Sequence, residues 1–178
     1  VETATGRKPA GFRAPSYAFS RHTLELMIDH GMIYDASLMG HDVPYLLSHP
    51  KGESVELPSQ RALDDWSHFV VSRDFNWMLP LQTPEHGFSI YRAEFDAAWR
   101  HGGIWIAVWH PFVTGRLSRA EAMDALIDHM KSKGGVWFAT MEEIAVHARK
   151  VREAGAWEPF VDPMPYDAGV LPELAERA

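Results

Sequence analysis

The chain has 178 residues, of which 46% are hydrophobic and 23% are charged, and this balance predicts one globular domain with a substantial core. The formal net charge of -7 argues against a nucleic-acid-binding surface, because such a surface needs basic side chains to neutralise phosphates. The lack of cysteine excludes disulfides, thiolate metal sites and a cysteine nucleophile. No apolar run reaches the roughly 20 residues of a membrane span, and we expect a cytoplasmic location.

Short strands around one helix are predicted for the first part of the chain. Residues 11–15 indicate a strand that Pro15 ends, and residues 32–34 indicate the start of a second strand. Between them, Ser20 is expected to cap a helix. The positions expected on one face of that helix are Leu24, Met27, Ile28 and Gly31.

A hairpin-like pattern follows. Residues 45–47 and 54–57 predict two short β segments around a turn, because the turn residues 50–52 separate them. From Arg61 to Gly87 the sequence is rich in aromatics and proline without a clear period. We therefore expect a long loop that contains the motif at residues 63–66.

Three amphipathic helices are predicted in the second half. The first ends at Gly102-Gly103, and the second begins with the capping-box pattern of Ser118 and Glu121 and ends at Gly134-Gly135. Thr140 and Glu143 repeat the capping-box pattern before the third helix. The expected apolar faces are Tyr91, Phe95 and Ala98, then Met123, Leu126, Ile127 and Met130, then Ile144, Ala148 and Val151.

Two apolar runs, at residues 104–109 and 136–139, predict strands buried on both faces, as in a parallel sheet covered by helices. The alternation of such runs with helices predicts an α/β fold. We expect residues 1–156 to form this domain and the proline-rich residues 157–178 to form an extended tail. The side chains assigned to the core from these two runs are Trp105, Trp109, Trp137 and Phe138.

His110 directly follows the first of these runs, and Pro111 prevents simple continuation of a strand. In closed α/β barrels the carboxyl ends of the strands carry the catalytic side chains, because the loops there vary while the strands hold their geometry. His110 is therefore the first candidate for a catalytic residue. The alternative is a buried histidine whose ring nitrogens are satisfied by backbone groups.

Several motifs together resemble the NodB-type polysaccharide deacetylase superfamily, in the branch of peptidoglycan deacetylase-like proteins, cyclic imidases and allantoinase-like amidohydrolases. The resemblance extends from about Gly11 to Arg149 in order and spacing. It implies the C-terminal part of a distorted (β/α) barrel. The motifs are Gly11-Phe12-Arg13-Ala14-Pro15, Ser20, Tyr34-Asp35-Ala36-Ser37-Leu38-Met39, Asp42, Pro44-Tyr45, Leu63-Asp64-Asp65-Trp66, His110-Pro111, Gly115-Arg116 and Ser118-Arg119.

The activity that this resemblance implies is metal-dependent hydrolysis of carbon-nitrogen amide bonds outside peptides. Members of the superfamily hold a divalent metal, commonly zinc, with an aspartate and two histidines spaced i and i+4, and this chain contains neither motif. We therefore expect no metal ligands in this chain. We expect a complementary N-terminal segment or subunit to supply them, the chain alone to be inactive, and the protein to form a homo-oligomer.

The resemblance also assigns roles to residues that are present. His110 corresponds to the general acid that protonates the departing nitrogen, and Arg13 to the arginine that pairs with the catalytic aspartate. Asp64 and Asp65 occupy the motif whose aspartate orients the acid histidine, and we favour Asp65 because it adjoins Trp66. The alternatives are an ordinary strand-end salt bridge for Arg13 and a solvated acidic pair for the two aspartates.

Candidate substrate-binding residues complete the predicted site. Trp66 is expected to line the pocket, although a tryptophan is often simply core, and Asp42 and Tyr45 match a segment near the substrate entrance. Arg116, with Arg119, would bind a substrate carboxylate through paired hydrogen bonds. The alternative is that these arginines pair with surface acids or support the loop of His110.

The substrate is expected to be a small molecule or a glycan, with acetylated sugar, cyclic imide and ureide all left open. Two non-enzymatic functions are alternatives to the hydrolase. One is a carbohydrate- or imide-binding domain that lacks the metal, and the other is an assembly subunit whose exposed strand edges pair with another chain. No nucleic-acid partner and no membrane span are expected.

Overall fold

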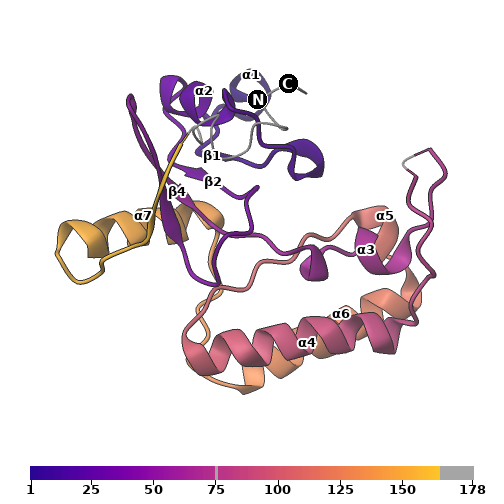
Figure 1. Ribbon diagram of the computed structural model, residues 1–178. Helices are drawn as coiled ribbons and strands as arrows, with labels where there is room; N and C mark the ends of the chain where they lie inside the picture. The colour runs from indigo at the N-terminus through magenta and orange to yellow at the C-terminus, as the bar shows by residue number, and fades with distance from the viewer. Residues whose placement is uncertain (75, 165–178) are drawn as a thin grey trace. The chain divides into compact units, whose positions relative to one another are not determined.

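The computed structural model describes residues 1–74 and 76–164 (Figure 1). The chain divides into two compact units. The first unit comprises residues 1–58 together with those described from 139 onward, and the second unit comprises residues 59–138. None of the helices in the described ranges combines the length and apolar character needed to cross a membrane.

A mixed, open sheet forms the centre of the first unit. Its strands lie in the order β1-β2-β4-β3-β5, and all neighbours pair in parallel except β3 and β4. Because β1, β2 and β4 run in parallel, their carboxyl ends meet at the same edge. The strand bounds are β1 (Gly11–Phe12), β2 (Tyr34–Asp35), β3 (Tyr45–His49), β4 (Gly52–Glu56) and β5 (Val161–Pro163).

The hairpin predicted from the turn residues is confirmed. β3 and β4 pair antiparallel in the register Tyr45↔Glu56 to His49↔Gly52, and Gly52 has φ 147°, a conformation that L side chains rarely adopt. The inward side chains of the hairpin are buried against the helix that precedes β2. The apolar cluster there contains Leu24, Tyr45, Leu47 and Met164, with Phe19, Ile28 and Leu38 packed around it.

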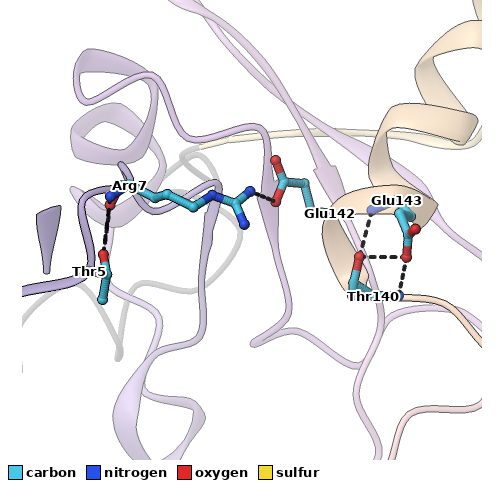
Figure 2. Close-up of polar contacts among 5 residues, drawn as sticks. All are labelled: Thr5, Arg7, Thr140, Glu142 and Glu143. Carbon is cyan, nitrogen blue, oxygen red and sulfur yellow. Dashed lines mark hydrogen bonds and ion pairs between the residues drawn. The ribbon is translucent and has the colours of Figure 1, made fainter.

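The helices of the first unit are α1 (Glu2–Thr5), the 3₁₀ turn η1 (Pro15–Tyr17), α2 (Thr23–Asp29) and α7 (Met141–Glu153). The predicted capping box of α7 is confirmed, with Thr140 Oγ1 accepting from the Glu143 backbone and the Glu143 carboxylate accepting from the Thr140 backbone (Figure 2). Figure 2 also shows Arg7 paired with Glu142 at 3.3 Å. The predicted Ser20 cap is wrong: α2 begins after His22 without a side-chain cap, and the Ser20 hydroxyl contacts the Thr23 hydroxyl and the His22 backbone N–H, which lie before or at the start of the helix.

Two long helices, α4 (Pro84–His101) and α6 (Leu117–Ser132), pack side by side in the second unit (Figure 1). Gly102 ends α4 in the left-handed conformation, as predicted. Short elements complete the unit: η2 (Arg61–Leu63), α3 (Trp66–Phe69) and α5 (Pro111–Thr114). The buried cluster contains Leu63, Phe69, Phe88, Tyr91, Phe95, Val113, Leu126 and Met130.

The prediction of strands at 104–109 and 136–139 is wrong, since neither run is a strand. The first makes a single bridge, Asp64↔Val108, because the facing segment is extended for only a few residues. Trp105 and Trp109 pack against the apolar cluster of the second unit, as predicted. Trp137 and Phe138 are 55% and 56% exposed, so their assignment to the core is wrong.

Two further predictions in this unit are corrected. The Ser118-Glu121 capping box does not form, because α6 already begins at Leu117 with Arg116 at its N-terminal cap and without a side-chain cap. The region from Arg61 to Gly87 is not one continuous loop. It contains η2 and α3, and α4 begins within it at Pro84, where the Thr83 side chain caps the helix.

Candidate active site

The backbone of the second unit brings His110 and Asp65 together. Val108 N donates to Leu63 O at 2.9 Å, and Asp65 N donates to Val108 O at 3.0 Å. These two bonds hold the segment that ends at Asp65 beside the segment that ends at His110. His110 itself is extended (φ -92°, ψ 127°), and Pro111 at the first position of α5 turns the chain into a short helix.

Asp65 is fully buried, and both of its carboxylate oxygens accept hydrogen bonds. Oδ1 lies 2.6 Å from His110 Nδ1, while Oδ2 accepts the His110 backbone N–H at 2.8 Å and the Thr114 hydroxyl at 2.6 Å. An ionised carboxylate only accepts, so Nδ1 of the ring carries the proton in this contact. Nε2 is therefore the nitrogen left for another group.

Asp64 is the second aspartate of the motif and has a different role. Its Oδ1 accepts the Trp66 backbone N–H at 2.9 Å and lies 3.9 Å from His110 Nδ1, beyond hydrogen-bond distance. Of the two candidates that the sequence left open, Asp65 is thus the one bonded to the imidazole ring. Asp64 orients the start of α3.

Two aromatic rings border the imidazole of His110. The ring centroid of Trp66 lies 5.5 Å away in an edge-on arrangement, that of Phe112 lies 5.6 Å away, and the two aromatic rings are 6.2 Å apart. The His110 side chain is 33% exposed, and Phe112 is 60% exposed. The ring is therefore held on one side by Asp65 and remains accessible to solvent.

Asp64, Asp65 and His110 also offer ligand atoms within 4.8 Å of one another, close enough for one metal ion. Their hydrogen bonds argue against that use. A cation at His110 Nδ1 would break the 2.6 Å bond to Asp65, and both Asp65 oxygens already accept N–H or O–H groups. These three residues do not fit the metal that the resemblance implies.

The other predicted site residues are described within their own units. Arg13, Asp42 and Tyr45 belong to the first unit, and Arg116 is exposed at the N-terminus of α6. Arg13 Nε donates to Ala36 O at 2.8 Å. Asp42 is exposed, whereas Tyr45 is only 1% exposed and packs in the apolar cluster of the first unit.

Arg119 supports the loop of His110, which is the structural alternative considered for the two arginines. Its Nε donates to Val113 O in α5 at 2.6 Å, and its guanidinium lies 5.4 Å from the ring centroid of Phe69. The first contact ties α6 to the segment that follows His110, and the second ties α6 to α3.

Thr114 and Phe112 were not predicted from the sequence. Thr114 is 2% exposed and bonds to the same Asp65 oxygen as the His110 backbone. The signal that could have found it is its spacing, because a residue four positions after His110 lies on the same side of a helical turn. Gly115 then ends α5 so close to Pro111 O that a Cβ would lie 2.2 Å from it.

Similarity to known proteins supports the same family as the motifs. The chain is 30% identical over 183 residues to the peptidoglycan deacetylase-like protein FGM2 of Gibberella zeae, covering 82% of this chain and 53% of that protein. It is 26% identical to the peptidoglycan deacetylase of Helicobacter pylori, covering 82% of this chain and 58% of that protein. The chain thus spans about half the length of the curated relatives it matches. No model of a protein family matches the sequence.

Solved structures agree with this result. A protein of Mycobacterium smegmatis described as a polysaccharide deacetylase has a TM-score of 0.81 and 35% identity, over 93% of this chain and 55% of that one. The Puue allantoinase has a TM-score of 0.72 over 88% of this chain and 50% of that one, and its 21% identity shows a shared fold alone. The fold, the motifs and these relatives together show that the chain belongs to the NodB-type polysaccharide deacetylase superfamily.

Proposed function

We propose that this chain is part of a hydrolase that cleaves non-peptide carbon-nitrogen amide bonds, and that His110 is its general acid. The observation that carries the proposal is the bond between Asp65 Oδ1 and His110 Nδ1 at 2.6 Å. A carboxylate in this position fixes the orientation of the ring and stabilises the imidazolium form. The proton for the substrate is then carried on Nε2.

Protonation of the leaving group is the step that such a residue would perform. The nitrogen of an amide is a very poor leaving group as an anion, so its departure needs a proton delivered as the carbon-nitrogen bond breaks. His110 Nε2–H donates that proton, and the resulting neutral ring keeps its Nδ1–H bonded to Asp65. Histidine is the side chain that enzymes use most often for such proton transfers.

The aromatic rings of Trp66 and Phe112 support a substrate position beside His110, because they border the imidazole and offer an apolar surface. Two relatives are named peptidoglycan deacetylases. An N-acetylated amino sugar in a glycan is therefore the first substrate class to test, with cyclic imides and ureides as the next classes.

The proposal includes a divalent metal, with zinc as the first candidate, that Asp64, Asp65 and His110 do not hold. We propose that its ligands belong to a complementary N-terminal segment or subunit, that Arg13 pairs with a carboxylate of that segment, and that the assembled protein is a homo-oligomer. Metal content measured on the full-length protein, together with its mass in solution, tests this part separately from the acid role of His110.

The direct test is the His110→Gln variant of the full-length protein, assayed on N-acetylated glycan oligomers, cyclic imides and ureides. We expect kcat to fall by about 10²- to 10⁴-fold, the usual contribution of a general acid, with a smaller change in KM. His129→Gln is the matched control, because His129 also bonds to an aspartate, Asp96, at 2.7 Å in the same unit. Equal activity of the two variants would overturn the proposed role.

A pH profile adds a second readout. The wild-type rate should decline on the alkaline side as the acid form of the histidine is lost, and His110→Gln should lack this decline. Added imidazole should partly restore the rate of His110→Gln and leave His129→Gln unchanged. An unaltered alkaline limb in His110→Gln would assign the proton donor to another residue.

A further inference from the structure

Two buried carboxyl groups lie side by side at the carboxyl edge of the sheet in the first unit. Asp35 ends β2, Glu56 ends β4, and the two are register partners in this parallel pair. Register partners on neighbouring strands point to the same face of a sheet. Both residues have 0% exposure, so the sheet holds two acids together away from bulk solvent.

Asp35 is surrounded by hydrogen-bond donors. Its Oδ2 accepts the Ser37 backbone N–H at 2.7 Å, and its Oδ1 accepts the Ser37 hydroxyl at 2.9 Å. The Ser37 oxygen in turn accepts the Ala14 backbone N–H at 2.8 Å. An ionised carboxylate suits this arrangement, since the Ser37 backbone and hydroxyl both donate to Asp35.

Glu56 has the opposite surroundings. Its Oε1 accepts the Leu38 backbone N–H at 2.9 Å, but its Oε2 is buried and meets no donor among residues 1–74 and 76–164. A buried oxygen without a donor is costly for a carboxylate, whereas a protonated oxygen becomes a donor itself. Burial and the neighbouring charge of Asp35 raise the pKa of Glu56 to about 10.

The proton on Glu56 has one natural acceptor, which is Asp35. A hydrogen bond from Glu56 lowers the pKa of Asp35, while burial acts more strongly in the other direction and leaves the pKa of Asp35 raised. The Arg13 guanidinium lowers the pKa of Glu56 but does not offset its burial. Tyr45, the register partner of Glu56 on β3, adds no charge to the pair at neutral pH.

Both acids hold the loop that Arg13 contacts. Asp35 binds Ser37 and Glu56 binds Leu38, while Arg13 Nε donates to Ala36 O at 2.8 Å in the same loop. Arg13 Nη2 is buried and has no partner within the described ranges. The direction of this guanidinium group therefore depends on where the loop holds the Ala36 carbonyl.

We propose that Asp35 and Glu56 share a single proton, carried by Glu56, and that this pair positions Arg13 by fixing the loop Ala36–Leu38. The two acids are positioning residues, since they act on Arg13 through the loop. The importance of Arg13 for a reaction rests on the proposed function, but the shared proton and the orientation of Arg13 do not.

The two acids give opposite results when each is replaced by its amide. In Glu56→Gln the side chain still accepts from Leu38 and donates to Asp35, so we expect a thermal midpoint at neutral pH equal to or above that of wild type. In Asp35→Asn the amide NH₂ group faces the Ser37 donors, so we expect the thermal midpoint to fall clearly below that of wild type. A fall for Glu56→Gln as large as that for Asp35→Asn would overturn the assignment of the proton.

The position of Arg13 is followed by NMR on the 178-residue chain, through hydrogen exchange of its side-chain Nε–H group, with the signal assigned from Arg13→Lys. We expect slow exchange in wild type and in Glu56→Gln. Ser37→Ala removes one bond to Asp35 and should accelerate exchange several-fold without unfolding the protein. Ser54→Ala is the matched control, because Ser54 is equally buried in β4 and its hydroxyl has no partner in the described part of the chain.

Unchanged Arg13 exchange in Ser37→Ala would overturn the positioning role. These measurements need no substrate and no metal, so their outcome is separate from that of the His110 variants. An active His110→Gln variant with the expected Arg13 exchange would remove the proposed reaction and leave the carboxyl pair intact.

Discussion

Asp65 binds both the ring and the backbone of His110: its Oδ1 lies 2.6 Å from Nδ1, and its Oδ2 accepts the backbone N–H at 2.8 Å. One carboxylate thus fixes where the residue enters α5 and how its ring is turned. Loss of that carboxylate should affect both the position and the protonation pattern of the imidazole.

The variant Asp65→Asn tests this dependence. Its amide NH₂ group would face the ring N–H, the backbone N–H or the Thr114 hydroxyl, so the His110 ring loses its fixed orientation. We expect kcat of the full-length protein to fall by about 10²- to 10⁴-fold. Asp64→Asn is the control, because Asp64 lies 3.9 Å from His110 Nδ1, and similar losses in both variants would contradict the distinction.

Thr114 should be needed for its hydroxyl group. Thr114→Val preserves the shape of the side chain but removes the 2.6 Å bond to the buried Asp65, so we expect the free energy of unfolding to fall by about 1–3 kcal/mol. Thr114→Ser keeps the hydroxyl, so its free energy of unfolding should fall by less than that of Thr114→Val. Urea denaturation measures both variants, and equal losses would indicate that the methyl group matters instead.

The capping box of α7 gives a prediction about the first unit. Thr140→Ala removes the cap and should lower the free energy of unfolding by about 0.5–2 kcal/mol. Two hydrogen bonds from Thr140 hold the pKa of the Glu143 carboxyl below its usual value. The bond from the Thr140 backbone contributes most, and the bond from its hydroxyl contributes less. This contribution is present above the unfolded pKa of Glu143 and is lost as pH falls through the folded one.

Acid titration of unfolding checks that sign. Thr140→Ala should lose somewhat less stability than wild type on acidification, because it lacks the hydroxyl bond to ionised Glu143 while the backbone bond from residue 140 remains. Glu142→Gln is a suitable control at the neighbouring position, since its partner Arg7 lies on the surface and the cap stays intact. An acid limb in Thr140→Ala as steep as in wild type would argue against a contribution from the Thr140 hydroxyl.

The raised pKa of Glu56 predicts a dependence of stability on pH with the opposite sign. Burial raises the pKa of Glu56 to about 10, so the folded protein keeps its proton up to about that pH, while the unfolded chain releases it near 4.5, the ordinary value for a glutamate. The stability that this proton supplies is complete below the unfolded pKa and declines as pH rises toward the folded one. Thermal midpoints should therefore fall above about pH 5.

Glu56→Gln removes this titration. The thermal midpoint of this variant should match that of wild type near pH 4 and exceed it increasingly at higher pH. Asp35 and Arg13 are the charged groups that remain near the position. Parallel curves for the two proteins between pH 4 and pH 9 would show that Glu56 is ionised in the folded state.

Local patterns in the sequence were sufficient to predict several structural elements. The hairpin of β3 and β4 and the capping box at Thr140 each depend on a few neighbouring residues, so turn and cap chemistry predicted them correctly. The left-handed end of α4 at Gly102 is of the same kind. Such features need no knowledge of distant segments.

The apolar run at residues 104–109 shows that local patterns do not predict pairing with a distant segment. An apolar run indicates burial, but it becomes a strand only if a neighbouring backbone pairs with it over several residues. Here the neighbour offers two hydrogen bonds, and the side chains pack against the apolar cluster of α4 and α6 instead. Trp137 was assigned to the core for the same reason, and it is 55% exposed.

The candidate site was also predictable from the sequence only in part. The motif resemblance named His110, Asp64 and Asp65, which the structure brings together in the second unit. It did not name Thr114, whose contact with Asp65 depends on a four-residue helix that starts at Pro111. The sequence favoured Asp65 over Asp64 only through its neighbour Trp66, whereas in the structure the path of the backbone decides which aspartate faces the ring.

The contact between Asp65 and His110 also has a consequence for the order of folding. The two residues are 45 positions apart in the chain, and α4 lies between them. Local helices form quickly, whereas a contact of this separation must first close a long loop. We expect α4 and α6 to appear early in refolding, before the imidazole meets its carboxylate.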